Sequence, residues 1–582
     1  MSRLWPWLVA SVASLWFFGI SAATYLGGSA GAFDFGYYLQ SIALIAHGVL
    51  NPTPALYPTH TYLADNIALY AYPLAAIYRL WQSPFLLIAA QSLVLGATAG
   101  VLAYAIARLS LPRWGRWATI ALVLLYPPAM AIAWELFHFD PLGGLLALLL
   151  LLALTNGRTR VAWLLVPLTL AVKEDAGLAV LAAALWVWLD PEAEPDGRRA
   201  APWIAAAGIT GFILEGMVLM PFLSPQHATE MHRQLFGVTG GLGAEIGVAF
   251  HALFWPQKGL YLLALLLPLG GLPLFAWRRL PAIAAAIGVN LLAADTFFSS
   301  GRFQYNGFVW PLLVLAAAEG LAVALRSGAR LRRWNAAVLL AAAAVVGQAE
   351  ANWPVVTAVR AAAASVIYAP EIARAQATVT NGTVYTTDVA GGYLASLPGD
   401  HTLPLADDGT YLAQLPAFAR YTYVAFDRPE LAASGGELQD VADLLRRSGY
   451  RTILDDGFFE VLERRPGDPG NVRLVYGPWH TVNVQWRQAD GVLQAFLPVH
   501  SGIWEAGVVM GRGGHGTLCA DVGRPLVCNE LTVLTQVGER QVALDVPRGK
   551  RMLHLDIYVE QGTPHPAIVS DVIRLRSIRY DR

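Results

Sequence analysis

Charged residues are scarce in this sequence, and their scarcity excludes an ordinary water-soluble fold for most of the chain. Only 14% of the 582 residues are Asp, Glu, Lys or Arg, against about 25% in a typical soluble domain. Hydrophobic residues make up 56%, and the mean hydropathy is +0.47. Runs of about 20 apolar residues, the length that a membrane-spanning helix needs, recur from the N-terminus to about residue 350. The composition beyond that position is ordinary, which predicts a membrane domain over residues 1–350 followed by a water-soluble tail.

Basic stripes and cysteines are also nearly missing. The 40 Lys and Arg residues balance 41 Asp and Glu, so that nothing indicates nucleic acid as a partner. The only two cysteines, Cys519 and Cys528, flank a turn-like VGRP in TLCADVGRPLVCNEL. Two strands around that turn would bring them together, so we predict a hairpin disulfide, with two unpaired thiols as the alternative. Such a bond persists outside the cytoplasm and rarely inside it.

The apolar runs predict about eleven membrane helices. The first run has one Arg and small residues and resembles a signal peptide, but the later runs favour a retained helix. The predicted helices lie near residues 4–23, 84–107, 117–133, 141–155, 161–172, 176–190, 201–222, 259–277, 281–295, 306–325 and 335–350.

The stretch LTLAVKEDAGLAVLA decides the topology, because Lys173, Glu174 and Asp175 interrupt an otherwise apolar region. The chain forms either one long helix with these charges in mid-membrane or two helices that turn at KED. The positive-inside rule favours the turn. A single helix would expose eight arginines on the outer face, namely Arg198, Arg199, Arg278, Arg279, Arg326, Arg330, Arg332 and Arg333. We therefore predict a hairpin, a cytoplasmic N-terminus and a tail outside the cytoplasm.

This orientation gathers acidic residues on the outer face. Asp34 precedes a segment with helical spacing from Phe35 to Ile45, so that helix capping is its ordinary explanation. Glu135 and His138 are three residues apart, which places them on one face of a helical turn. A carboxylate can take a proton from an attacking hydroxyl. Several carboxylates with a histidine can hold Mg²⁺, Mn²⁺ or Ca²⁺, and the candidates for such a site are Glu135, His138, Asp140, Glu174 and Asp175. Solvated loop acids and helix caps are the alternative for any one of them.

Five segments occur in the order and spacing of a known family: FDFGYYLQSIALIAHG, NIALYAYPLAAIYRLW, ELFHFDPLGGLLALLLLLAL, LLVPLTLAVKEDAGLAV and GRFQYNGFVWPLLVLAAAEGL. Over residues 30–465 the chain resembles the bacterial membrane-protein family DUF2079, which is similar to the GT-C glycosyltransferases. The resemblance implies a GT-C-like helical membrane fold that takes a sugar from a polyprenyl-phosphate carrier on the outer face of the bacterial cytoplasmic membrane. The acceptor would be a glycan, a lipid or a protein, and membrane lipids would surround the enzyme.

The resemblance also assigns roles to residues. Asp34 matches the acid of the first outer loop that serves as the catalytic base or its orienting partner, and the Asp–x5–Gln pattern continues to Gln40. His138 with Pro141 and the Lys173–Asp175 turn match two further motifs, whereas the expected histidine and proline before the second span are replaced by LADNIALYAYP, with His60 as a possible stand-in. Outward-facing candidates for the substrate are Lys173, Arg233 and Arg302 for the phosphate and Tyr305 for the sugar ring.

Two other functions stay open. A transporter or flippase of lipid-linked sugars needs polar residues through the whole membrane depth, and here only Glu215 and Glu319 are unexplained at mid-span. A non-catalytic scaffold for envelope assembly is the second alternative.

The tail is predicted to hold two modules outside the membrane. Residues 369–465 alternate strand-like and helix-like stretches, which indicates a small α/β module, and RRPGDPGN is a plausible linker. Residues 472–582 contain short alternating runs separated by Gly and Pro, which indicates a β-sandwich. Such modules often bind carbohydrate, and Trp479, Trp486 and Trp504 are candidates for contact, with a core role as the alternative.

Overall fold

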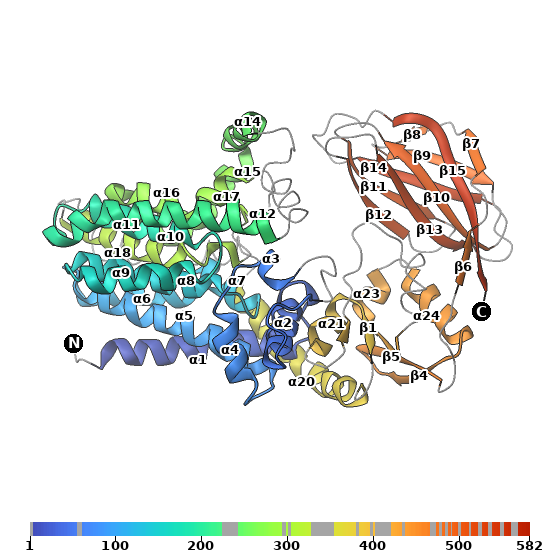
Figure 1. Cartoon of the computed structure of the whole chain (residues 1–582), viewed down its shortest axis with the longest axis horizontal. Helices are drawn as coiled ribbons and strands as arrows, with labels where there is room; N and C mark the ends of the chain where they lie inside the picture. Colours follow the sequence, from blue (N-terminus) through green and yellow to red (C-terminus); the bar gives the residue numbers. More distant parts are fainter. Residues whose placement is uncertain are drawn as a thin grey trace. The chain divides into compact units, whose positions relative to one another are not determined.

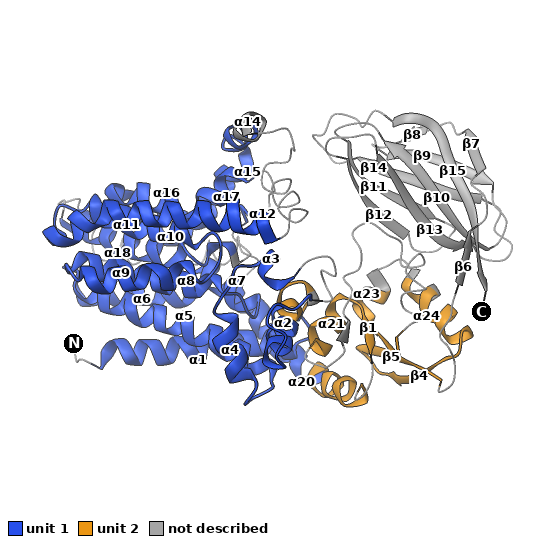
Figure 2. Ribbon diagram, viewed as in Figure 1, with its two compact units in different colours: residues 1–30, 38–367 blue, residues 31–37, 368–582 orange. Residues whose placement is uncertain are grey.

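The structure is a computed structural model that divides into two compact units (Figure 2). Unit 1 contains residues 1–30 and 38–367, and unit 2 contains residues 31–37 and 368–582. The residues described are 4–54, 61–223, 242–293, 298–300, 304–326, 354–379, 383–395, 400–401, 421–433 and 437–465, together with the strands between 473 and 581.

Unit 1 is built of apolar helices (Figure 1). Proline in the first turn starts several of them, because the helix leaves that backbone N–H unused and proline fixes a helical φ. The elements are α1 (Trp5–Leu26), α2 (Tyr37–Ala46), α3 (Tyr62–Asp65), α4 (Ala71–Tyr78), α5 (Pro84–Ala107), α6 (Arg113–Leu125), α7 (Pro127–Trp134), α8 (Asp140–Thr155), α9 (Thr159–Leu170), α10 (Ala176–Trp188), α11 (Pro195–Ile213), the π-helix η2 (Leu214–Leu219), α12 (Met220–Leu223), α14 (Leu242–Ala252), α15 (Pro256–Leu266), the 3₁₀ helices η3 (Leu267–Leu269) and η4 (Leu272–Arg279), α16 (Leu280–Ala286), α17 (Gly288–Leu292), the 3₁₀ helix η5 (Gln304–Asn306), α18 (Trp310–Arg326) and α20 (Pro354–Thr378).

The predicted hairpin at KED is confirmed. α9 ends at Leu170 and α10 begins at Ala176, so that Lys173, Glu174 and Asp175 lie in the turn between them. α10 then returns against α11 through a close glycine contact, since a Cβ on Gly177 would lie 2.4 Å from the carbonyl oxygen of Gly208. Small residues of this kind let two apolar helices approach closely.

The helix count differs from the prediction of eleven spans. Five described helices are long and apolar enough to cross a membrane, or six if one bent pair counts as a single span. α8, α9 and α10 are shorter apolar helices. The predicted spans 259–277 and 281–295 are replaced by that bent pair, Pro256–Leu269 and Leu272–Ala286, which meet at 107°. The bend lies at Gly270 and Gly271, both of which adopt a positive φ that ends a helix.

One helix was missing from the prediction. α20 (Pro354–Thr378), whose residues from 368 onward belong to unit 2, is also long and apolar enough to span a membrane. Its most apolar stretch of 18 residues has a mean hydropathy of 1.3, against 2.0 for α5, because Arg360 and Glu371 interrupt the apolar residues. The predicted span 335–350 lies outside the described residues.

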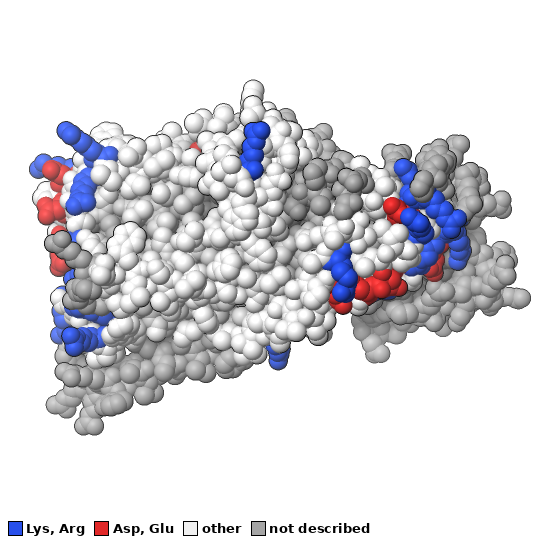
Figure 3. Space-filling model, turned by 90° about the horizontal axis from the view of Figure 1, so that it is seen from below, with Lys and Arg blue, Asp and Glu red and all other residues white. Residues whose placement is uncertain are grey.

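The turns of unit 1 form a basic end and an acidic end. At the basic end, Arg108 donates to Asn156 Oδ1 over 3.0 Å, and the N–H of Glu194 donates to the carbonyl of Thr155 over 3.3 Å. These bonds join the turns that carry the arginines predicted to face the cytoplasm. Figure 3 shows a broad flank of unit 1 almost bare of Lys, Arg, Asp and Glu, with such side chains gathered at one end of the helices. A flank of this kind suits contact with lipid.

Glu319, unexplained by the sequence, lies in an ionic cluster around Arg279. The guanidinium donates from Nε to Glu319 Oε2 over 2.7 Å and from Nη2 to Asp190 Oδ2 over 2.9 Å. Nη1 donates to the carbonyl of Trp186 over 3.0 Å. One planar group thereby ties η4, α10 and α18 together.

Replacing Arg279 with Met is expected to destabilise the protein by about 3–5 kcal/mol, because it leaves two largely buried carboxylates without their cation. Unfolding in detergent micelles measures this loss. Arg278→Met is the matched control, since Arg278 lies 5.6 Å from the exposed ring of Trp277 and makes no such pair. Equal, small effects of the two substitutions would contradict the role of the cluster.

Unit 2 contains a five-stranded sheet in the order β2-β1-β3-β5-β4. β1 is parallel to β2 and β3, and β5 is antiparallel to β3 and β4. The elements are the π-helix η1 (Ala32–Gly36), β1 (Val384–Thr386), α21 (Asp388–Leu394), β2 (Asp400–His401), β3 (Tyr423–Asp427), α23 (Arg428–Ala433), α24 (Glu437–Arg447), β4 (Tyr450–Asp455) and β5 (Phe459–Arg464). An α/β sheet therefore occupies the region in which the sequence predicts an α/β module.

The described strands between residues 473 and 581 are antiparallel and form two sheets. One has the order β13-β10-β15-β6, with β7 also paired to β15, and the other has the order β12-β11-β14-β9-β8. The strands are β6 (Arg473–Tyr476), β7 (His480–Asn483), β8 (Arg487–Ala489), β9 (Val492–Pro498), β10 (Gly502–Met510), β11 (Gly514–Asp521), β12 (Val527–Val533), β13 (Gly538–Val546), β14 (Met552–Val559) and β15 (Ile568–Asp581). A sandwich of these sheets and carbohydrate binding stay predictions. Trp479 and Trp486 lie outside the described residues, and Trp504 lies in β10.

The strand register bears on the predicted disulfide. Cys519 in β11 is the direct partner of Cys528 in β12. Opposed residues in an antiparallel pair have Cα atoms about 4.5–5.5 Å apart, which a disulfide can span. The bond itself stays a prediction.

Candidate functional site

The loop after α7 carries two of the predicted site residues in an unusual backbone conformation. Glu135 caps the C-terminus of α7, and Leu136 follows with φ +67°. Among the described residues other than glycine, Leu136 alone has a positive φ. Such a conformation costs a bulky residue about 1–3 kcal/mol and is typical of functional sites. Glu135 and His138 are therefore near each other through this turn, and the prediction that they share a helical turn is wrong.

Gln91 of α5 holds this loop in place. Its Nε2 donates to the carbonyls of Ile132, over 2.8 Å, and Leu136, over 3.0 Å. Its Oε1 accepts from the backbone N–H of His138 over 2.6 Å. The side chain is 2% exposed, so these bonds are made away from water. Gln91 was not among the residues predicted from the sequence, although a lone amide within a 24-residue apolar helix was the available signal.

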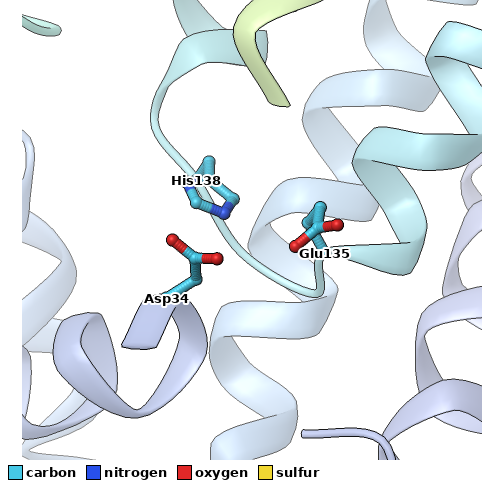
Figure 4. A group of neighbouring side chains, drawn as sticks. All are labelled: Asp34, Glu135 and His138. Carbon is cyan, nitrogen blue, oxygen red and sulfur yellow. The ribbon is translucent and has the colours of Figure 1, made fainter. Parts of the chain in front are cut away.

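Asp34, Glu135 and His138 form a group able to bind a metal ion. Each offers one ligand atom, and the three atoms all lie within 4.8 Å of one another. Figure 4 shows the Asp34 carboxylate directed toward the other two side chains. Asp34 lies in the middle of the π-helix η1, so it is not the N-cap of α2. Single-turn π-helices occur frequently at functional sites.

The donor set suits a divalent cation. Carboxylate oxygens favour Mg²⁺, Ca²⁺ and Mn²⁺, while imidazole favours transition metals. The combination of two carboxylates with one histidine fits Mn²⁺ best among the three predicted ions. The predicted metal set is therefore divided in the structure, because Asp140, Glu174 and Asp175 lie around Lys173 instead.

Lys173 is the centre of this second cluster. Its Nζ lies 3.4 Å from Asp140 Oδ1 and 4.0 Å from Glu174 Oε1. The same nitrogen lies 6.0 Å from the centre of the Tyr305 ring. Asp140 starts α8 only two residues after His138, so the lysine cluster adjoins the candidate metal ligands.

Two further segments pack against the lysine cluster. The N–H of Ile67 donates to Glu174 Oε2 over 3.4 Å, and the N–H of Leu69 donates to the carbonyl of Ala171 over 3.0 Å. A Cβ on Gly307 would lie 2.5 Å from the Cβ of Asp140, so only glycine allows this approach. The segment that contains Ile67 and Leu69, the KED turn and the segment that contains Tyr305 therefore meet at the acidic end of unit 1.

Burial sets the protonation of the KED turn. It raises the pKa of Glu174 to about 8 and that of Asp175 to about 6, against the opposing effect of the Lys173 ammonium. Burial lowers the pKa of Lys173, but Asp140, Asp175 and Glu174 together hold it well above its ordinary value. At neutral pH Lys173 is therefore an ammonium and Glu174 is mostly protonated.

Of the other predicted site residues, two are described by the structure and three are not. Gln40 is buried in α2 with 6% of its surface exposed, and Tyr305 lies in η5. Tyr38, which the sequence placed only on a helix face, packs its ring edge-on at 5.4 Å from the His138 ring. His60, Arg233 and Arg302 lie outside the described residues.

A comparison with family models matches residues 29–382 to the family described as "Predicted membrane protein (DUF2079)". No curated protein matches the chain. Among solved structures, the chain is similar to that of ArnT from Cupriavidus metallidurans in the apo state, with 12% sequence identity and a TM-score of 0.38, over 77% of this chain and 97% of that one. The family match and the apolar helices together identify a multi-pass membrane protein.

Proposed function

We propose that this chain, which belongs to the family of predicted membrane proteins DUF2079, is a membrane glycosyltransferase that takes a sugar from a polyprenyl-phosphate carrier. The observation that carries the proposal is the grouping of Asp34, Glu135 and His138 beside a buried lysine. Such a site combines a base, a place for a cation and a fixed positive charge. Transfer from a lipid phosphate needs these parts, because the acceptor must lose a proton and the leaving phosphate carries negative charge.

Asp34 is the proposed base. A carboxylate has two oxygens, so that one can bind a cation while the other accepts the proton of the acceptor hydroxyl. Its position in a one-turn π-helix directs the carboxylate toward the group rather than into a capping bond (Figure 4).

Asp34, Glu135 and His138 would hold the divalent cation, for which Mn²⁺ is the best fit. When bound, a cation of this kind neutralises the negative charge of the phosphate as it leaves. Gln91 fixes the backbone of the two ligands that follow α7.

Lys173 is proposed to bind the donor phosphate, with Tyr305 beside it for the sugar. Because Glu174 is mostly protonated at neutral pH, its carboxyl group adds almost no negative charge beside the Lys173 ammonium. An anion can therefore approach Lys173 without meeting three negative charges. Arg233 and Arg302 stay proposed as further phosphate ligands.

The site is proposed to face the outside of the bacterial cytoplasmic membrane. The basic turns of unit 1 lie at the end opposite the acidic site, as the positive-inside rule requires for a cytoplasmic basic end. Glu319 no longer supports the flippase alternative, because its pairing with Arg279 explains this acidic residue without a transport path. Glu215 lies in the π-helix η2.

Raising the pH from about 5 to about 9 is expected to increase the KM for the donor by about three- to tenfold. Asp175, with a pKa of about 6, and then Glu174, with a pKa of about 8, change from neutral to negative beside Lys173 and repel the phosphate. Steady-state kinetics across this range measures the change. Glu174→Gln should remove the upper part of the rise, and a KM independent of pH would contradict the assignment.

The decisive experiment supplies the purified protein in nanodiscs with a panel of polyprenyl-phosphate sugars, with and without a chelator. The expected result is transfer or hydrolysis of one sugar, loss of that activity with chelator and its return with Mn²⁺. Translocation of intact lipid-linked sugar between leaflets, without release of sugar, would instead establish the flippase. A protein that neither releases nor translocates any sugar of the panel would favour the scaffold.

A further inference from the structure

The sheet of unit 2 changes winding direction between β1 and β3. From β1 the chain passes through α21 to β2 on one side of the sheet, and from β3 it passes through α23 and α24 to β4 on the other side. In open α/β sheets, ligands bind outside the carboxyl ends of the strands at such a switch point. The residues that follow β1 and end β3 are therefore those that this fold usually gives to a ligand.

The two strand ends are fastened to each other. Thr387 Oγ1 donates to Asp427 Oδ2 over 2.6 Å and accepts from the N–H of Asp427 over 3.0 Å. Both side chains are fully buried, and the N–H of Thr387 donates to the carbonyl of Ala425 over 3.1 Å. The place of the next residue, Asp388, at the start of α21 is thereby fixed.

The Asp388 carboxylate accepts a hydrogen bond from the backbone of a segment that lies 355 residues earlier in the chain. Its Oδ1 accepts from the N–H of Phe33 over 3.2 Å. A Cβ on Gly31 would lie 3.3 Å from Asp388 Oδ2, so the backbone at Gly31 also lies directly beside this carboxylate. Residues 31–37 consequently belong to unit 2 rather than to the helices on either side of them in sequence.

The segment held in this way is η1, which carries Asp34. A single π-turn has few hydrogen bonds of its own, and here the N–H of Gly36 donates to the carbonyl of Gly31 over 3.0 Å. Because isolated turns are marginal in water, the conformation of η1 depends on contacts from outside it.

We propose that Asp388 is a positioning residue for Asp34: the α/β module uses the edge at which such folds bind ligands to hold the peptide that carries the candidate base. The inference rests on the proposed function in one respect, namely that Asp34 acts in transfer. It gives this edge of the module a task, namely to hold residues 31–37.

Hydrogen–deuterium exchange of the full-length protein in nanodiscs, without donor, tests the contact. Asp388→Ala is expected to accelerate exchange across residues 31–37 by about tenfold, the factor that corresponds to one lost hydrogen bond. Asp388→Asn keeps an acceptor oxygen and should behave as the wild type. Asp455→Asn is the control in the same sheet, because its largely exposed carboxylate pairs with Arg428. Unchanged exchange of residues 31–37 in Asp388→Ala would overturn the proposal.

A second variant covers the case in which Asp388→Ala unfolds the module. Gly31→Val changes the other side of the contact: its branched side chain presses against the Asp388 carboxylate, while the residues of the sheet are unchanged. It should accelerate exchange of residues 31–37 but not of β1 and β3. If β1 and β3 accelerate equally, or if residues 31–37 stay protected, the contact has no positioning role.

Transfer assays separate this proposal from the proposed function. Asp388→Ala should lower kcat more than it raises KM, and Asp388→Asn should restore kcat. If Asp34→Asn leaves transfer intact while Asp388→Ala still accelerates exchange of residues 31–37, the catalytic role of Asp34 fails and the holding contact stands.

Discussion

Asp34→Asn is expected to lower kcat by about 10²–10⁴-fold, because the amide cannot take a proton from the acceptor and general bases contribute factors of this size. The substitution keeps the shape of the side chain, so the unfolding temperature should stay near that of the wild type. Transfer with a fixed donor concentration and thermal unfolding in the same detergent measure the two quantities.

The matched control is Asp65→Asn. Asp65 is the last residue of α3, where Asn66 Nδ2 donates to its carboxylate over 2.7 Å, but it is not one of the grouped ligands. It should keep nearly full activity. Wild-type kcat in Asp34→Asn, or equal losses in both variants, would contradict a special role for Asp34.

Excess metal distinguishes the two roles proposed for the Asp34 carboxylate. If Asp34 serves only as a ligand, Asn weakens Mn²⁺ binding, and a high concentration of Mn²⁺ restores kcat. If Asp34 serves as the base, a high concentration of Mn²⁺ restores the metal occupancy of the site but does not restore kcat. Titration of Mn²⁺ followed by electron paramagnetic resonance gives the occupancy for this comparison.

Gln91→Met is expected to destabilise the protein by about 2–5 kcal/mol and to lower kcat by about 10²-fold. Methionine is similar in size but has no polar hydrogen, so that two carbonyls and the N–H of His138 lose their partner inside the bundle. The strained φ of Leu136 would then relax and move both Glu135 and His138. Unfolding in micelles and Mn²⁺ affinity measure the effects.

Ser92→Ala is the control for this substitution. Ser92 is the next residue of α5 and is equally buried, but its hydroxyl bonds only to the carbonyl of Ile88 within the same helix. The expected loss is below about 1 kcal/mol, with metal affinity unchanged. Should Gln91→Met keep the metal affinity of the wild type, the amide would have no part in forming the site.

The sequence predicted the features of the membrane unit that depend on composition and charge. The hairpin at KED followed from the arginines on either side of it, because charge in loops determines topology more strongly than helix length does. α20 was not predicted for the complementary reason: charged residues, among them Arg360 and Glu371, lower the hydropathy of a helix that is long enough to span a membrane. The family was recognised from five ordered segments, and its model matches residues 29–382.

The interior of the site was less accessible to prediction. Asp34, Glu135, His138 and Lys173 were all named, yet the division of the acids into a metal group and a lysine cluster depends on side-chain direction at the start of α8. The positive φ of Leu136 could not be predicted, because this conformation is normally indicated by a glycine and the position holds a leucine. Gln91 matched no motif, because its function depends on backbone groups that become neighbours only when α5 and α7 pack together.

The bond between Phe33 and Asp388 also sets an order of events during synthesis. Its two partners are separated by 355 residues, so the ribosome has synthesised all of unit 1 before it adds Asp388, the hydrogen-bond acceptor. A nascent chain that has inserted its first helices therefore carries an unfinished loop around Asp34. Residues 31–37 can therefore reach the conformation that Asp388 holds only after the tail has been synthesised.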